Sequence, residues 1–184
     1  TVAPIIRARL ARDGAQAAVE IDGCNLSIRY AQQDHGQVKS AVLLEFGARA
    51  TGEPADFHDI ACDSAAAGLD IDLPTARPRV MKAERTFWEK ATALHAEAHR
   101  PPESPTPQYF SRHFYDLAML LDTDDGKAAC SDYELLVQVA KHKAVFFRSA
   151  WASYDTACPG TLRLLPSEAR IKDLRADYRA MAPM

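Results

Sequence analysis

Two consecutive segments of the chain carry charged residues whose types and spacing could serve phosphoryl chemistry. Lys90 follows Glu89 in the first segment, and Arg112 and Asp116 stand four residues apart in the second. A lysine can contact phosphate oxygens as a mobile point charge. An aspartate facing it could hold the lysine or take part in activating an acceptor hydroxyl. These residue types therefore suit a site that neutralises a phosphorylated substrate and positions its partner.

Both segments have the periodicity of helices. In residues 84–97, Phe87, Ala91 and Leu94 recur at helical spacing and predict a core-facing stripe, with Lys90 at its edge. Residues 112–121 are apolar on most faces, which predicts a buried helix. A charged pair on such a helix is better explained if a polar ligand or metal faces it. The alternative is an i, i+4 ion pair between Arg112 and Asp116, which contributes a few tenths of a kcal/mol.

The proline-rich connection between these helices should turn the second back on the first. Residues 100–107 contain four of the prolines in the chain. We therefore expect Lys90 and Asp116 to point into one shared concave surface. That surface is predicted beside the end of a strand at residues 43–47, with Arg112 and Glu45 within reach of it.

The sequence pattern in the first third of the chain predicts β-strands. Two alternating runs flank Asp22-Gly23, a strong hairpin signal, and a third run follows at residues 39–50. Its apolar stretch, Val42 to Leu44, predicts a central strand covered on both faces. Glu45 ends that strand and is a candidate metal-side acid; the alternative is a rim glutamate paired with Arg49.

The fold class predicted from this order is α+β. A small, mainly antiparallel sheet is expected within residues 17–82 and a helical bundle from residue 83 onward. We accordingly divide the chain into a sheet-containing portion, 1–82, and a helical portion, 83–184. One of the later helices is expected to start at Ser131, with Glu134 completing a capping box.

Three further patterns could carry chemistry and are interpreted as structural. Asp70 and Asp72 have the spacing of a magnesium-binding pair on a strand, but the chain has no glycine-rich G-G-T/S segment to accompany them, and they are interpreted as solvated loop acids. His95 and His99 share a helix face without a third metal ligand at usable spacing, so a solvent-facing helix end is expected. The basic run from Lys141 to Lys143 suits a helix C-terminus, with a nucleic-acid contact as the alternative.

Composition limits the function classes. With 184 residues and a net charge of −3, the chain is long enough for a real core and is not a generally basic nucleic-acid-coating protein. No apolar run approaches the roughly 20 residues of a membrane helix, and no signal-peptide pattern opens the chain. The four cysteines are far apart and are interpreted as reduced thiols, which predicts a cytoplasmic protein that binds no membrane.

The run RTFWEKATALH, followed by SRHFYDLAML, resembles the AbiEii/AbiGii-type nucleotidyltransferase toxin family. That family carries an E-K pair on one helix and R-x-x-x-D, or R-D-x-x-D-L, on a following helix. His113 stands where the longer form has an aspartate. The resemblance implies Lys90 and Asp116 as catalytic residues and Glu89, Arg112 and Glu45 as supporting ones, with no metal ligand assigned.

The resemblance also implies an activity. The intact protein would use Mg²⁺ and a nucleoside triphosphate to transfer a nucleoside monophosphate to an RNA or protein acceptor. It would be the toxin half of a toxin–antitoxin or bacterial phage-defence pair, with the cognate antitoxin or the product of a neighbouring gene as partner. The chain begins with Thr1 and lacks the family's G-G-T/S segment and the D-x-D that follows it. We therefore expect a processed or truncated N-terminus, no tightly bound cofactor and no activity of this portion alone. The alternative is a non-catalytic helical module that binds a protein or RNA partner.

Overall fold

The computed structural model describes residues 2–31, 40–49, 52–68 and 73–181. The chain forms two compact units, residues 1–50 with Met184 and residues 51–183, and each unit is described on its own.

The first unit is a helix followed by a three-stranded antiparallel sheet. Its elements are α1 (Val2–Arg12), β1 (Ala17–Asp22), β2 (Asn25–Tyr30) and β3 (Ala41–Glu45). The predicted hairpin is confirmed, since β1 pairs with β2 from Ala17–Tyr30 to Asp22–Asn25 and Gly23 adopts a φ of 57° in the turn. A positive φ is readily adopted by glycine because it lacks a Cβ atom.

The prediction that the third strand is central is wrong. The strand order is β1-β2-β3, so within the described residues β3 pairs with β2 alone and lies at an edge. Its residues Val42 and Leu43 are 50% and 54% exposed. Antiparallel strands joined in succession keep their chain order, and an apolar run alone does not show which strand has two neighbours.

The second unit begins with two short antiparallel ladders. Strand β4 (Ala55–Phe57) pairs with β7 (Arg79–Met81), and β5 (Ile60–Ala61) pairs with β6 (Thr75–Ala76) around the 3₁₀ helix η1 (Asp63–Ala67). All strands of the described residues therefore lie within the predicted range 17–82, and helices follow from residue 83. The α+β prediction is confirmed, although the strands form three small sheets instead of one.

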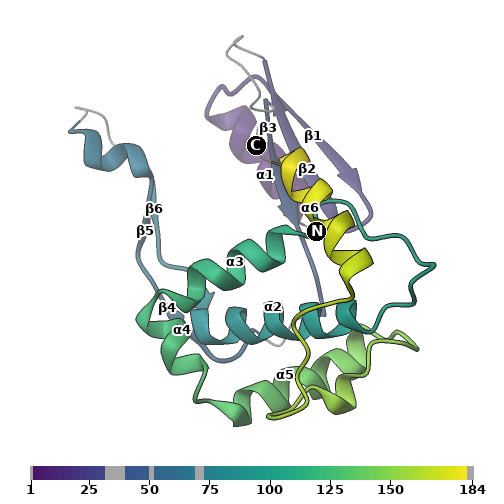
Figure 1. The fold of residues 1–184 in the computed structure, drawn as a ribbon. Helices are drawn as coiled ribbons and strands as arrows, with labels where there is room; N and C mark the ends of the chain where they lie inside the picture. Colours follow the sequence, from purple (N-terminus) through teal and green to yellow (C-terminus); the bar gives the residue numbers. More distant parts are fainter. Residues whose placement is uncertain (1, 32–39, 50–51, 69–72, 182–184) are drawn as a thin grey trace. The chain divides into compact units, whose positions relative to one another are not determined.

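The rest of the second unit is helical and is organised around α2. The helices are α2 (Ala83–Ala98), α3 (Arg112–Leu121), α4 (Asp124–Ala129), α5 (Tyr133–Phe146), the 3₁₀ helix η2 (Tyr154–Thr156) and α6 (Glu168–Met181). Helix α2 contacts α3, α4 and α5, and Figure 1 shows it between α3 and α5. Its apolar stripe forms the core with α3, α4 and α5, through Phe87, Trp88, Ala91, Leu94, Leu117, Ala129, Leu135, Leu136 and Val139. Full burial of one large apolar side chain contributes about 1.5–3 kcal/mol.

Two predictions about helices α3 and α5 are wrong. Only Leu117 of α3 is buried, while Tyr115 and Met119 are each 51% exposed, because the helix packs on α2 through a single stripe. Helix α5 is capped by Asp132, whose carboxylate accepts the Leu135 N–H at 2.9 Å, and not by Ser131. Aspartate and serine are similarly good N-caps, so the sequence alone does not choose between adjacent candidates.

Candidate functional site

Lys90 of α2 and Asp116 of α3 are in direct contact. The Lys90 Nζ lies 2.6 Å from the Asp116 Oδ2, and their side chains are 24% and 37% exposed. The chain between the helices turns α3 back on α2, so the residues predicted to share a surface do so. The contact is partly open to solvent and therefore accessible to a ligand.

His113 is the second neighbour of the Lys90 ammonium. Its Nδ1 lies 3.3 Å from the Lys90 Nζ. Burial, followed by the charges of Lys90 and Arg112, lowers the pKa of His113 to about 4. The imidazole is consequently neutral near pH 7, and its Nδ1 can accept a hydrogen bond from the ammonium.

Glu89 is held by two buried cations. Its Oε1 lies 2.9 Å from the Arg85 Nη2 and its Oε2 lies 3.2 Å from the Lys143 Nζ. Lys143 also donates a hydrogen bond to the Glu89 backbone carbonyl. The Arg85 guanidinium, in turn, donates to the Glu53 carbonyl at 2.5 Å. The Glu89 side chain therefore links α2 to α5, and both of its carboxylate oxygens are paired.

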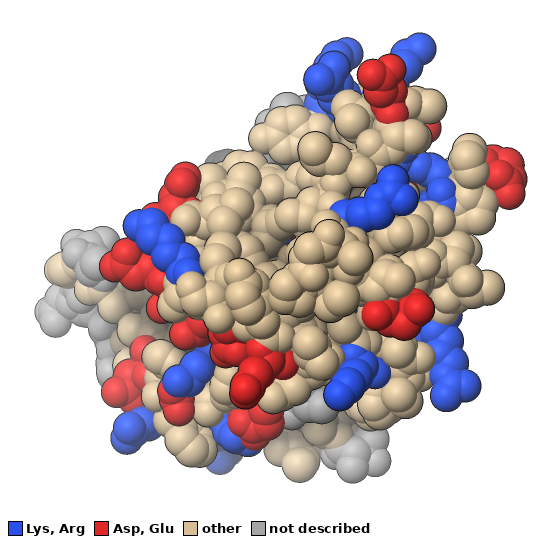
Figure 2. Space-filling model, turned by 60° about the horizontal axis from the view of Figure 1, so that its bottom comes forward, with Lys and Arg blue, Asp and Glu red and all other residues tan. Residues whose placement is uncertain are grey.

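The two groups of contacts together carry excess positive charge. Arg85, Lys90 and Lys143 provide three cations against the carboxylates of Glu89 and Asp116, while His113 is neutral. An uncompensated cation in a partly buried site favours an anionic ligand. Over the wider surface, basic and acidic side chains are interspersed on the face shown in Figure 2.

Of the other two predicted supporting residues, Arg112 lies outside these contacts and Glu45 belongs to the other unit. Arg112 is exposed, and within the described part of the chain Asp116 pairs with Lys90 instead of Arg112, so the i, i+4 alternative is wrong. Glu45 is the last residue of β3, in the first unit, and its proximity to Lys90 stays a prediction.

The histidine pair on α2 is structural, and its predicted solvent exposure is wrong. His95 is 0% exposed; its Nε2 lies 2.9 Å from the Ser153 carbonyl oxygen and its Nδ1 accepts the Arg163 N–H at 2.9 Å. This arrangement fixes the neutral tautomer with the proton on Nε2. Burial also lowers the pKa of His95 below its usual value.

The described residues offer no ligand set for the Mg²⁺ that the family resemblance implies. Among them, no three His, Cys, Asp or Glu side chains gather in a way that could hold a metal. Glu89 has both oxygens paired and Asp116 has one oxygen on Lys90. Asp70 and Asp72 lie outside the described residues. A divalent ion needs several oxygen ligands, so these residues alone do not fit one.

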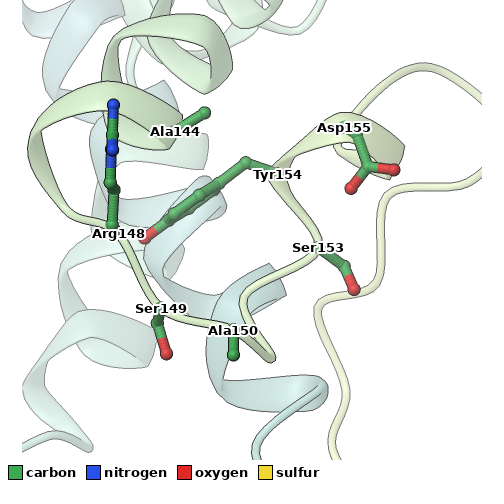
Figure 3. A pocket seen from close by; sticks show the side chains of 7 residues that line it. All are labelled: Ala144, Arg148, Ser149, Ala150, Ser153, Tyr154 and Asp155. Atoms are coloured by element: carbon green, nitrogen blue, oxygen red, sulfur yellow. The ribbon is translucent and has the colours of Figure 1, made fainter.

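A pocket of about 520 Å³ lies at the end of α5 (Figure 3). It is lined by Ala144, Arg148, Ser149, Ala150, Ser153, Tyr154 and Asp155. The ring of Tyr154 extends toward Arg148. Burial and the charge of Glu89 raise the pKa of Tyr154. Neither Lys90 nor Asp116 is among the lining residues, so this pocket is not the predicted shared surface.

The burial of Lys143 was not predicted, because the basic run from Lys141 to Lys143 was expected only to suit a helix C-terminus. The signal lies in its register: Lys143 follows Val139 by four residues and Leu136 by seven, which places it on the buried face of α5. Lysine is almost never fully buried unless it is paired. A lysine on an apolar stripe therefore predicts a buried acidic partner.

Among the described residues, no helix combines the length and the apolar character needed to cross a membrane. A family model described as "Nucleotidyl transferase AbiEii toxin, Type IV TA system" matches residues 2–184. No curated protein matches the chain. No solved structure matches it either.

Proposed function

The chain belongs to the AbiEii family of nucleotidyl transferase toxins of a type IV toxin–antitoxin system, and on this premise we propose that Lys90 and Asp116 form part of its active site. The reaction is transfer of a nucleoside monophosphate from a nucleoside triphosphate to an RNA or protein acceptor in the bacterial cytoplasm. The observation that carries the proposal is the half-exposed contact between Lys90 and Asp116 in a cluster with excess positive charge.

Lys90 is placed to bind a phosphate group. Its ammonium is shared between one carboxylate oxygen and one neutral imidazole nitrogen, 2.6 Å and 3.3 Å away. A triphosphate carries more negative charge than this pair of acceptors, so it competes for the ammonium. Charge developing on phosphate oxygens in the transition state is stabilised by such a preorganised cation.

Asp116 then has two consecutive roles. It orients Lys90 before the nucleotide binds, and it accepts the proton of the acceptor hydroxyl during transfer. That hydroxyl oxygen attacks the α-phosphorus and forms the new O–P bond, the bond to the bridging oxygen between the α- and β-phosphates breaks, and pyrophosphate leaves. A carboxylate within hydrogen-bond reach of the hydroxyl is suited to this task.

Mg²⁺ would neutralise charge on the triphosphate when it is bound. Because the described residues do not fit this ion, none of the steps above depends on a metal ligand in this part of the chain. Family membership implies an antitoxin partner, and a role in phage defence is part of the proposal.

The experiment uses the full gene product, a cell extract as the source of acceptor, and nucleotides labelled with ³²P at either the α- or the γ-phosphate. We expect α-label to become attached to an acceptor and γ-label not to, which separates nucleotidyl transfer from phosphoryl transfer. Sensitivity of the labelled product to RNase or to protease then assigns the acceptor class.

Three variants locate the site. Lys90→Ala and Asp116→Ala should each abolish labelling, whereas Lys141→Ala, at an exposed position of α5, should label like the wild type. Absence of labelling by a folded wild-type protein that still binds RNA or a partner protein would favour the non-catalytic module instead.

A further inference from the structure

We propose that Lys143 is a positioning residue of the nucleotide site, which it serves by holding the Glu89 carboxylate away from Lys90 and from the incoming triphosphate. This inference rests on the proposed function. It adds a residue of α5 to a site formed by α2 and α3.

Lys143 lies at a buried position, where a charged side chain lowers the stability of the fold unless it is paired. The residue is 7% exposed, and its Nζ reaches both the Oε2 and the backbone carbonyl of Glu89. Burial lowers the pKa of Lys143, and the charge of Glu89 opposes that effect. The ammonium is thus tolerated because Glu89 accompanies it. Apolar residues in place of the whole Lys143–Glu89 pair would be about as stable or more stable, so stability alone does not explain a lysine here.

Two cations are needed to pair both oxygens of the Glu89 carboxylate. Arg85, on the preceding turn of α2, takes one carboxylate oxygen at 2.9 Å, and Lys143 takes the other at 3.2 Å. Glu89 is 23% exposed and directly precedes Lys90 in the chain. If Lys143 is removed, one oxygen becomes free to point into the site. A free carboxylate there repels the phosphates of the nucleotide and attracts the ammonium that should bind them.

Lys143 also fixes the backbone of α2 at the site. Its contact with the Glu89 carbonyl joins α5 to α2 one residue before Lys90. The ammonium of Lys90 is therefore placed by a helix held on both sides, by α3 through Asp116 and by α5 through Lys143.

The test compares three variants of the full gene product in steady-state transfer kinetics, at a temperature where circular dichroism shows each to be folded. Lys143→Met removes the charge and keeps the length of the side chain. Lys141→Met removes the same charge from an exposed position of the same helix. The double variant Glu89→Gln, Lys143→Met also removes the carboxylate that Lys143 restrains, while the amide oxygen can still accept from Arg85.

We expect Lys143→Met to lower kcat/KM for the nucleotide by tenfold or more, mainly through KM. Lys141→Met should change it by less than twofold, and the double variant should regain most of the loss. The KM ratio of Lys143→Met to wild type should also shrink as salt is raised, because salt screens the repulsion from Glu89. A merely structural role moves the melting temperature but not this salt dependence.

Two results would overturn the inference. Lys143→Met could match Lys141→Met, or the double variant could be no better than Lys143→Met. If the wild type transfers nucleotide and Lys90→Ala does not, either result defeats only the role of Lys143. If the folded wild type neither binds nor transfers a nucleotide, the proposed function and this inference both fail.

Discussion

Two of the charge groups on helix α2 differ in how completely the protein encloses them. Toward its C-terminal end is a sealed cluster, which we define as Glu97, Arg100 and Arg170. One and a half to two turns earlier is an open pair, Lys90 and Asp116. In the first, Glu97 and Arg170 are buried and Arg100 is 19% exposed; in the second, both residues are partly exposed.

The sealed cluster holds the chain in place. The Glu97 side chain is 1% exposed and lies 2.6 Å from the Arg100 Nε and 3.6 Å from the Arg170 Nε. The remaining guanidinium nitrogens of Arg170 donate to the connection between α2 and α3, at the Pro101 carbonyl (2.8 Å), the Ser104 carbonyl (2.7 Å) and the Thr106 hydroxyl (2.9 Å). All three nitrogens of the Arg170 guanidinium face acceptors within the protein, so this arginine has little capacity to bind a ligand.

The open pair leaves its polar atoms available. The Lys90 ammonium has two acceptors, and the Asp116 carboxylate is 37% exposed. Charge on a helix therefore indicates a binding function only where solvent can reach the charged group and its partners within the protein leave it free to bind a ligand. By the same criterion Glu89, which is saturated by Arg85 and Lys143, supports the site without binding substrate directly.

The largest loss of folding stability is expected when the sealed cluster is broken. Arg170→Met leaves Glu97 buried with Arg100 alone and removes the donors of three acceptors in the connection between α2 and α3. Loss of one partner of a buried ion pair costs about 3–5 kcal/mol. For a chain of this length the melting temperature should fall by roughly 10 °C, as measured by calorimetry.

The matched control is Arg175→Met, an exposed arginine of the same helix. It should change the free energy of unfolding by no more than about 0.5 kcal/mol. Equal destabilisation by the two variants would show that the cluster is not the source of the effect.

A smaller effect on stability is expected from His113, the histidine beside the open pair, and it depends on pH. The pKa of His113 is about 4 in the folded protein, below its usual value of 6.5, so the unfolded chain binds more protons between these values. The stability that His113 contributes is present above pH 6.5 and is lost as the pH falls toward 4. Urea unfolding of His113→Gln should therefore show a weaker decline between pH 7 and pH 5 than the wild type.

His113→Gln keeps an acceptor for Lys90 but cannot titrate. Part of the acid sensitivity should persist, because the pKa of His95 is also lowered by burial. Unfolding free energies of wild type and variant that decline in parallel with pH would contradict this account of His113.

The sequence predicted the open pair better than the sealed cluster, for a physical reason. Lys90 and Asp116 belong to short motifs on helices whose periodicity fixes their boundaries, and the fold-back of the helices brings them together. Arg170 meets Glu97 from 73 positions away in the chain, a contact that no local pattern encodes. The edge position of β3 likewise depends on which strands pair, which periodicity does not determine.

The smallest effect on stability is expected at the open pair, although its loss should abolish nucleotide transfer. Melting temperature and transfer of α-labelled nucleotide are measured on the same preparations of wild type, Lys90→Ala and Asp116→Ala. A partly exposed ion pair contributes up to about 1 kcal/mol, so both variants should melt within a few degrees of the wild type. Both should nevertheless have lost transfer. Variants that melt much lower yet retain transfer would show that the pair is structural and contradict the account.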